Sequence, residues 1–195
     1  MRGMRRLKRI FSKPRVSHLV GSERIPGLAQ AGLTAIGTGN AIRVPIETDR
    51  KGRTKDFNKD GNCAGYAVRV AKIIFGLDYE KGHAWDLAKW NHLSLRLATK
   101  TGWGSSRIER PVVPLEKIEN HLVPGCLLGI YLPWSPEQIS HPRRLYTHTV
   151  LYLGKRNGTH WVMHNMKGPV FQPLEELLDQ GKTKGILVDV ILPGA

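Results

Sequence analysis

The feature that most constrains the fold is a hairpin signal near the C-terminal end of the sequence. An Asn-Gly pair, Asn157-Gly158, separates the runs YTHTVLYLG and THWVMHN, which contain many β-branched and aromatic residues. Asn-Gly tolerates the positive φ angles that a two-residue hairpin turn requires, so we predict two antiparallel strands joined at this pair. Because successive side chains in a strand point to opposite faces, His148 shares a face with Val150 and not with Thr149.

Helices are expected before this hairpin. The run CAGYAVRVAKIIF places apolar residues on one face at helical spacing, with Asn62 as its N-cap and Gly76 at its end. A second run, AWDLAKWNHLSLRLATK, repeats apolar residues in a similar way, so we predict that residues 62–100 are mainly helical. Residues 21–61 are rich in Gly, Thr and Pro, and we expect them to be mostly irregular.

Strands dominate the C-terminal part of the sequence, residues 122–195. Pro124-Gly125 opens the run CLLGIYL, and GILVDVIL forms a last apolar run that Asp189 interrupts. The segment PLEELLDQ, which begins at Pro173, predicts a short helix before that last strand. Helices followed by antiparallel strands indicate an α+β fold, and we expect one domain over residues 21–195.

Positive charge is concentrated at the start of the chain. The sequence has 195 residues and a net charge of +14, and residues 1–15 contribute seven Arg and Lys side chains with no acid. We expect residues 1–20 to form a basic arm that contacts an anionic polymer, which charge alone does not identify. The sequence has no apolar run of membrane-spanning or signal-peptide length. We therefore expect a monomer without a membrane span or classical signal peptide, made in the cytoplasm and acting at the cell wall or in a target cell.

Cys63 is the candidate nucleophile. It stands at the first turn of the predicted helix, directly after Asn62, where the partial positive charge of a helix N-terminus favours a thiolate. His148, at the start of the first hairpin strand, can take the thiol proton and return it to the leaving amine. The imidazole needs an orienting partner, and His164 and Asn165 on the second hairpin strand both lie level with it. These two side chains point to opposite faces, so only one can serve, and we favour His164.

The runs NCAGYAVRVAKIIFG, LVPGCLLGIYL, YTHTVLYLG and HWVMHN together resemble the NlpC-type cell-wall peptidases, and the related CHAP amidases, of the papain-like cysteine peptidase superfamily. The resemblance covers residues 60–168. It implies a papain-like fold, in which N-terminal helices, with the nucleophile at a helix start, pack on an antiparallel sheet. Carried over by position, it makes Cys63 the nucleophile, His148 the base and His164 the orienting residue. It also implies hydrolysis of amide bonds in peptidoglycan peptides without a cofactor, as in a phage lysin or an antibacterial toxin.

The sequence departs from the family pattern around these residues. Asn62 precedes the nucleophile where Asp is usual, and Cys126 replaces the Asp of a Pro-Gly-Asp strand start. Cys63 and His148 are 85 residues apart, with an insertion around residues 86–120. The residues that we expect to bind substrate beside the nucleophile are Asn62, Tyr66, Trp85, Tyr146 and Asn165.

No metal site is expected. Asp56, Asn58 and Asp60 match the start of a calcium loop, but the final position of that loop lacks the required Glu. His160 and His164 have a spacing that binds zinc on a helix. On a strand they lie about 13 Å apart, at about 3.3 Å for each residue, which excludes joint chelation.

Other functions stay open at this point. The same Cys–His pair would suit a papain-like hydrolase or acyltransferase that acts on a protein or lipid substrate, because a fold does not fix a substrate. A basic nucleic-acid-binding protein is the alternative from another class, although aromatic and basic residues do not alternate as a stacking platform requires. An inactive relative that binds wall peptides is a further alternative.

Overall fold

The computed structural model describes residues 24–59, 61–80, 87–101, 107–132, 145–180 and 184–194. The predicted basic arm, Asp60 and Trp85 lie outside the described residues. The helices are α2 (Arg24–Thr38), α3 (Cys63–Phe75), α4 (Leu87–Trp90) and α6 (Leu174–Asp179), with the 3₁₀ helices η3 (Leu115–Lys117) and η4 (Glu119–His121). The strands are β1 (Glu47–Thr48), β2 (Thr54–Lys55), β3 (His92–Arg96), β4 (Thr99–Thr101), β5 (Arg107–Glu109), β6 (Leu127–Tyr131), β7 (His148–Arg156), β8 (Thr159–Asn165), β9 (Pro169–Pro173) and β10 (Ile186–Leu192).

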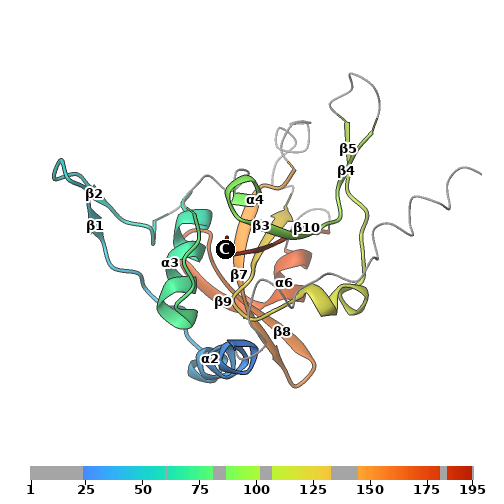
Figure 1. Ribbon diagram of the computed structural model, residues 1–195, viewed down its shortest axis with the longest axis horizontal. Coiled ribbons are helices and arrows are strands. Elements are labelled where there is room, and N and C mark those ends of the chain that lie inside the picture. Colours follow the sequence, from blue (N-terminus) through green and yellow to red (C-terminus); the bar gives the residue numbers. More distant parts are fainter. Residues whose placement is uncertain are drawn as a thin grey trace, which may run out of the picture.

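A six-stranded sheet in the order β3-β10-β6-β7-β8-β9 forms the centre of the molecule. All of its neighbouring strands are antiparallel. The pairs β1–β2 and β4–β5 form separate two-stranded hairpins that extend away from the sheet (Figure 1). Helices thus combine with an antiparallel sheet, which confirms the α+β class.

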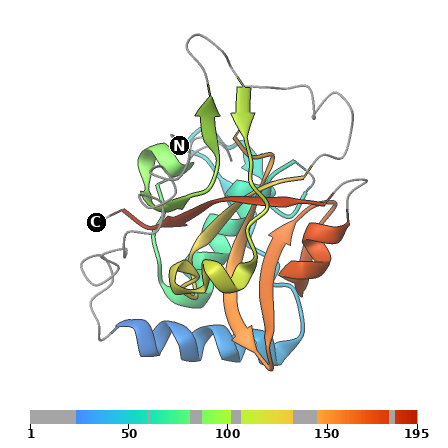
Figure 2. The same ribbon diagram turned by 90° about the vertical axis from the view of Figure 1, so that its right-hand side faces the viewer.

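Helices cover both faces of the main sheet (Figures 1 and 2). On one face, Tyr66 of α3 joins Leu151 of β7 in a buried core. On the other face, Leu177 of α6 joins Val150 of β7 in a second core. The successive residues Val150 and Leu151 enter different cores because strand side chains alternate between faces.

The hairpin predicted from the Asn-Gly pair is confirmed. Strand β7 pairs antiparallel with β8, and Arg156 lies opposite Thr159 across the turn. Both turn residues have positive φ, 52° at Asn157 and 81° at Gly158, as a two-residue hairpin turn requires. The predicted helices at residues 63–75 and 174–179 are also present, and α3 ends at Gly76 with a left-handed φ of 66°.

The expectation that residues 21–61 are mostly irregular holds for much of residues 39–59 but is wrong for residues 24–38, which form α2. Its glycines disfavour a helix locally, which hid it in the sequence. Packing explains why one of these glycines, Gly32, is present. A Cβ at Gly32 would collide with the backbone carbonyl of Leu153, so glycine lets α2 approach β7 closely.

The second predicted helix, around residues 85–100, is also wrong. Among the described residues of that stretch, which begin at Leu87, only those of α4 are helical, and strands β3 and β4 follow. In β3, Leu93 and Leu95 alternate with His92, Ser94 and Arg96, which is the period of a strand. Pairing with β10 decides the outcome, since β3 forms an edge of the main sheet. Within the described part of the chain, no helix has the length and apolar character needed to span a membrane.

Candidate active site

Two histidines meet at the ends of neighbouring central strands. Nε2 of His148, the first residue of β7, lies 2.9 Å from Nδ1 of His164 in β8. The ring centroids are 4.9 Å apart and the rings are perpendicular. Both side chains are buried, His148 at 2% exposure and His164 at 0%. The structure therefore brings together the predicted base and the preferred orienting residue.

Burial keeps both imidazoles neutral. It lowers the pKa of His148 well below its ordinary value, and the neighbouring His164 adds to this effect. Burial likewise lowers the pKa of His164 to about 4. At neutral pH the pair therefore consists of two neutral rings, one of which donates to the other. A neutral imidazole is the form that can accept a proton from a thiol.

Cys63 begins α3 and is half-buried. The expected side-chain cap from Asn62 is wrong: Asn62 occupies the N-cap position, but its side chain makes no capping hydrogen bond. Its backbone carbonyl accepts from Tyr66 N–H at 2.9 Å, while its Nδ2 donates to the Lys59 carbonyl at 3.4 Å. The first turn of α3 also contains no acidic residue. No nearby acid on the helix therefore offsets its positive end, which favours a thiolate at Cys63.

Asn165 holds the loop that leads into α3. Its Nδ2 donates to the carbonyls of Phe57 and Lys59, at 2.6 Å each, and its Oδ1 accepts from Gly168 N–H at 3.0 Å. The amide of Asn165 thus binds the loop, whereas His164 contacts His148. At 1% exposure, Asn165 is also not available for the predicted contact with substrate. It instead ties the approach to Cys63 to the residue that follows His164.

A second set of contacts supports the same loop from the side of α3. The guanidinium of Arg69 lies over the Phe57 ring, 3.2 Å from its centroid. Arg69 also donates from Nε and Nη2 to the carboxylate of Glu47, at 2.5 Å each. A Cβ at Gly65 would lie 2.5 Å from the Phe57 ring, so the helix accepts this ring only because residue 65 has no side chain. The loop before Cys63 is thus fixed from both α3 and β8.

Two predicted substrate-binding tyrosines are structural. Tyr66 has no exposed surface, and its hydroxyl donates to the Ile42 carbonyl at 2.6 Å. Tyr146 is equally buried and packs on Gly129, where a Cβ would come within 2.8 Å of its ring. Gly129 lies opposite Thr149, so Tyr146 belongs to the core under α3 and not to the face of His148. Burial of the ring thus overturns both assignments.

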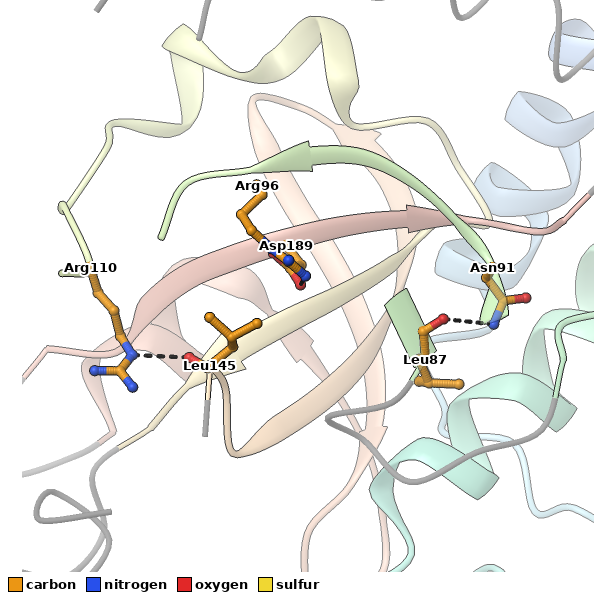
Figure 3. A network of polar contacts seen from close by, with 6 residues as sticks. All are labelled: Leu87, Asn91, Arg96, Arg110, Leu145 and Asp189. Carbon is orange, nitrogen blue, oxygen red and sulfur yellow. Dashed lines mark hydrogen bonds and ion pairs between the residues drawn. The ribbon is translucent and has the colours of Figure 1, made fainter. Parts of the chain in front are cut away.

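A buried ion pair near the start of β7 was missed from the sequence. Asp189, with no exposed surface, accepts two hydrogen bonds from Arg96, at 2.9 and 2.8 Å (Figure 3). Close by, Nε of Arg110 donates to the Leu145 carbonyl at 2.9 Å, and its guanidinium lies 3.9 Å from the centroid of the Tyr131 ring. Leu145 precedes His148 by a few residues, so these contacts fix the chain that enters β7. The available signal was Asp189 itself, because a lone acid in an apolar strand needs a cationic partner.

Cys126 differs from Cys63 in its surroundings. It is fully buried, and burial raises the pKa of its thiol to about 12. A thiol in that setting stays protonated and unreactive. Neither cysteine forms a disulfide, so Cys63 is the better candidate for a nucleophile.

Comparisons with protein-family models, with curated proteins and with solved structures found no match to this chain. The strand register places His148 on the face of Val150, whereas α3 packs on the face of Leu151. The function is therefore argued from the contact between His148 and His164, and from Asn165, which bonds the end of β8 to the loop before Cys63.

Proposed function

We propose that the chain is a papain-like cysteine hydrolase in which Cys63 is the nucleophile, His148 the general base and His164 the residue that orients the base. The observation that carries this proposal is the buried 2.9 Å contact between Nε2 of His148 and Nδ1 of His164. Asn165, the next residue, binds the loop that leads into the helix of Cys63, which supports a common site for all three. The papain-like character of the α+β fold is part of the same proposal.

The chemistry proceeds by covalent catalysis. His148 takes the proton from the Cys63 thiol, and the thiolate attacks the carbonyl carbon of an amide. The tetrahedral intermediate collapses as the same imidazole protonates the leaving amine, which leaves an acyl thioester on Cys63. Water, deprotonated by His148, then attacks the thioester and releases the acid. His164 keeps the ring oriented through both steps.

The substrate class that fits best is an amide bond in peptidoglycan peptides. The resemblance to NlpC-type and CHAP enzymes supports this choice, and the net charge of +14 favours contact with anionic wall polymers. The protein would act at the cell wall, of its own host or of a target cell. No cofactor is needed, because the thiol and the imidazoles supply the nucleophile and the proton transfers.

The test is the release of new amino groups from purified peptidoglycan. Wild-type protein should release them, Cys63→Ala should lower the rate by about 10³-fold or more, and Cys126→Ala should cleave at a near-normal rate when folded. Equal rates for wild type and Cys63→Ala would contradict the proposal. Intact walls, together with cleavage of protein or lipid amides that depends on Cys63, would keep the cysteine mechanism and reassign the substrate.

A further inference from the structure

The side-chain amide of Gln172 in β9 lies on the same side of the sheet as His164. Nε2 of His164 and Nε2 of Gln172 are both buried and lack a hydrogen-bond partner among the described residues. His164 has 0% exposure and Gln172 has 9%. An unsatisfied buried polar atom costs free energy, so two of them in one region call for an explanation.

The strand register places these two side chains beside each other. Gln172 of β9 lies opposite Val162 of β8, and His164 lies opposite Val170. Opposite residues share a face, and so do residues two apart on one strand, so Gln172 and His164 are diagonal neighbours on the same face. Diagonal partners in an antiparallel pair have Cα atoms about 7–8 Å apart, within reach of long side chains.

The Gln172 amide is bonded at its other end. Nε2 of Gln180, just after α6, donates to Oε1 of Gln172 at 3.0 Å. The oxygen of Gln172 is therefore engaged with Gln180, and the NH₂ group is the part that remains buried without a partner. Gln172 thus presents a hydrogen-bond donor on the face that it shares with His164.

The proposed chemistry fixes the protons on both rings. For His148 to act as a base while Nε2 contacts His164, its Nδ1 must carry the free lone pair, so its Nε2–H donates to Nδ1 of His164. His164 then carries its own proton on Nε2, which is the atom that lacks a partner. Both unsatisfied groups, His164 Nε2–H and Gln172 Nε2–H, are therefore donors, and one water molecule can accept from both.

Resting on the proposed function, we infer that Gln172 is a positioning residue for catalysis. Through one buried water it holds His164 as the Nε2–H tautomer, and this in turn keeps Nδ1 of His148 unprotonated, as the ring nitrogen that accepts the proton of Cys63. The chain of contacts runs from Gln180 through Gln172 and the water to His164 and His148. Gln172 touches no reacting atom and acts only through His164.

The first test measures the tautomers directly. Long-range ¹H–¹⁵N NMR spectra of the full chain at neutral pH should show His148 and His164 as neutral rings protonated on Nε2. In Gln172→Leu, the His164 signals should shift toward the Nδ1–H form or a mixture. His164 protonated on Nδ1 in the wild type would overturn the inference, and so would unchanged spectra in the folded variant.

The second test follows the rate at which iodoacetamide alkylates Cys63 as a function of pH. Gln172→Leu should alkylate about 5–10-fold more slowly at pH 7, with an altered pH profile, while Gln172→Glu should recover part of the rate because its carboxyl can still bind the water. Gln30→Leu, the same change on an exposed part of α2, should match the wild type. A Gln172→Leu protein with reduced melting temperature and a wild-type pH profile would mark Gln172 as structural only.

These readouts separate the two proposals. If walls and other amides stay uncleaved while the NMR spectra show the expected tautomers, the hydrolase proposal fails and the hydrogen-bond chain stands. If cleavage depends on Cys63 and the tautomers do not respond to Gln172, the hydrolase proposal stands and the role of Gln172 is wrong.

Discussion

Nδ2 of Asn165 lies 2.6 Å from the backbone carbonyl of Lys59, so the end of β8 is bonded to the loop that precedes the helix of Cys63. The same nitrogen binds the Phe57 carbonyl. The position of Cys63 relative to the end of β8 thus depends on one buried amide as well as on the packing of α3.

Replacing Asn165 should therefore disturb the site more than the fold. In Asn165→Ala the carbonyls of Phe57 and Lys59 lose their donor, and we expect a loss of about 1–3 kcal/mol in the free energy of unfolding. Alkylation of Cys63 should slow by about 10-fold or more, because the loop no longer holds its position. Urea unfolding and iodoacetamide kinetics measure the two effects. A variant that alkylates at the wild-type rate would show that this contact does not position Cys63.

Substitutions of two helical glycines, Gly65 in α3 and Gly27 in α2, test how the loop before Cys63 packs on α3. Ala at Gly65 would place a Cβ 2.5 Å from the Phe57 ring, whereas a Cβ at Gly27 of α2 would meet nothing within 4 Å. Gly65→Ala should cost about 1–3 kcal/mol of stability and slow alkylation of Cys63. Gly27→Ala should stabilise the protein by about 0.5–1 kcal/mol and leave alkylation unchanged. Thermal melts of both variants check the prediction, and equal effects of the two substitutions would contradict it.

Acid should destabilise the protein through its buried histidines. Burial lowers the pKa of His164 from an ordinary 6.5 to about 4, so between these values the unfolded chain binds a proton that the folded chain does not. The stabilisation is fully present above pH 6.5 and is lost as the pH falls to about 4. One such group accounts for roughly 3 kcal/mol across that interval.

Urea unfolding at several pH values measures this slope. His164→Gln should make this slope shallower, whatever the stability of the variant at neutral pH, because one of the two buried titrating imidazoles is gone. A wild-type stability that is constant between pH 6.5 and 4 would mean that His164 is readily protonated in the folded protein.

Removing only one partner of the Arg96–Asp189 ion pair should lower the free energy of unfolding. Arg96→Met leaves the fully buried Asp189 without its partner, and we expect a loss of about 3 kcal/mol or more in the free energy of unfolding. The double variant Arg96→Met/Asp189→Leu should recover much of that loss, since it removes the buried charge as well. A double-mutant cycle by urea unfolding tests this expectation. Additive losses in the double variant would show that the two side chains do not interact.

Local patterns predicted the parts of the fold that local chemistry determines. Asn157-Gly158 predicted the hairpin turn, and the predicted hairpin placed His164 and Asn165 about level with His148. Gly76 marked the end of α3. These features depend on backbone conformation and spacing, which can be read along the chain.

Features that depend on distant contacts were not predictable in the same way. Gly32 lowers the helix propensity of α2 but lets the helix pack closely against β7, and this packing cannot be read from the local sequence. Tyr66 and Tyr146 are predicted to bind substrate because they are near Cys63 and His148 in sequence, yet both rings are buried. The contact of His164 with His148, and those of Asn165 with the loop before Cys63, could likewise not be read from the sequence.

The central claim is that Cys63 carries an acyl group during turnover. The most direct measurement is mass spectrometry of the intact protein after acid quenching of its reaction with soluble peptidoglycan fragments. We predict a mass increase that matches an acyl fragment of the stem peptide, located on Cys63 and absent from Cys63→Ala. Cleavage that continues with no such adduct, and after complete alkylation of Cys63, would contradict the account.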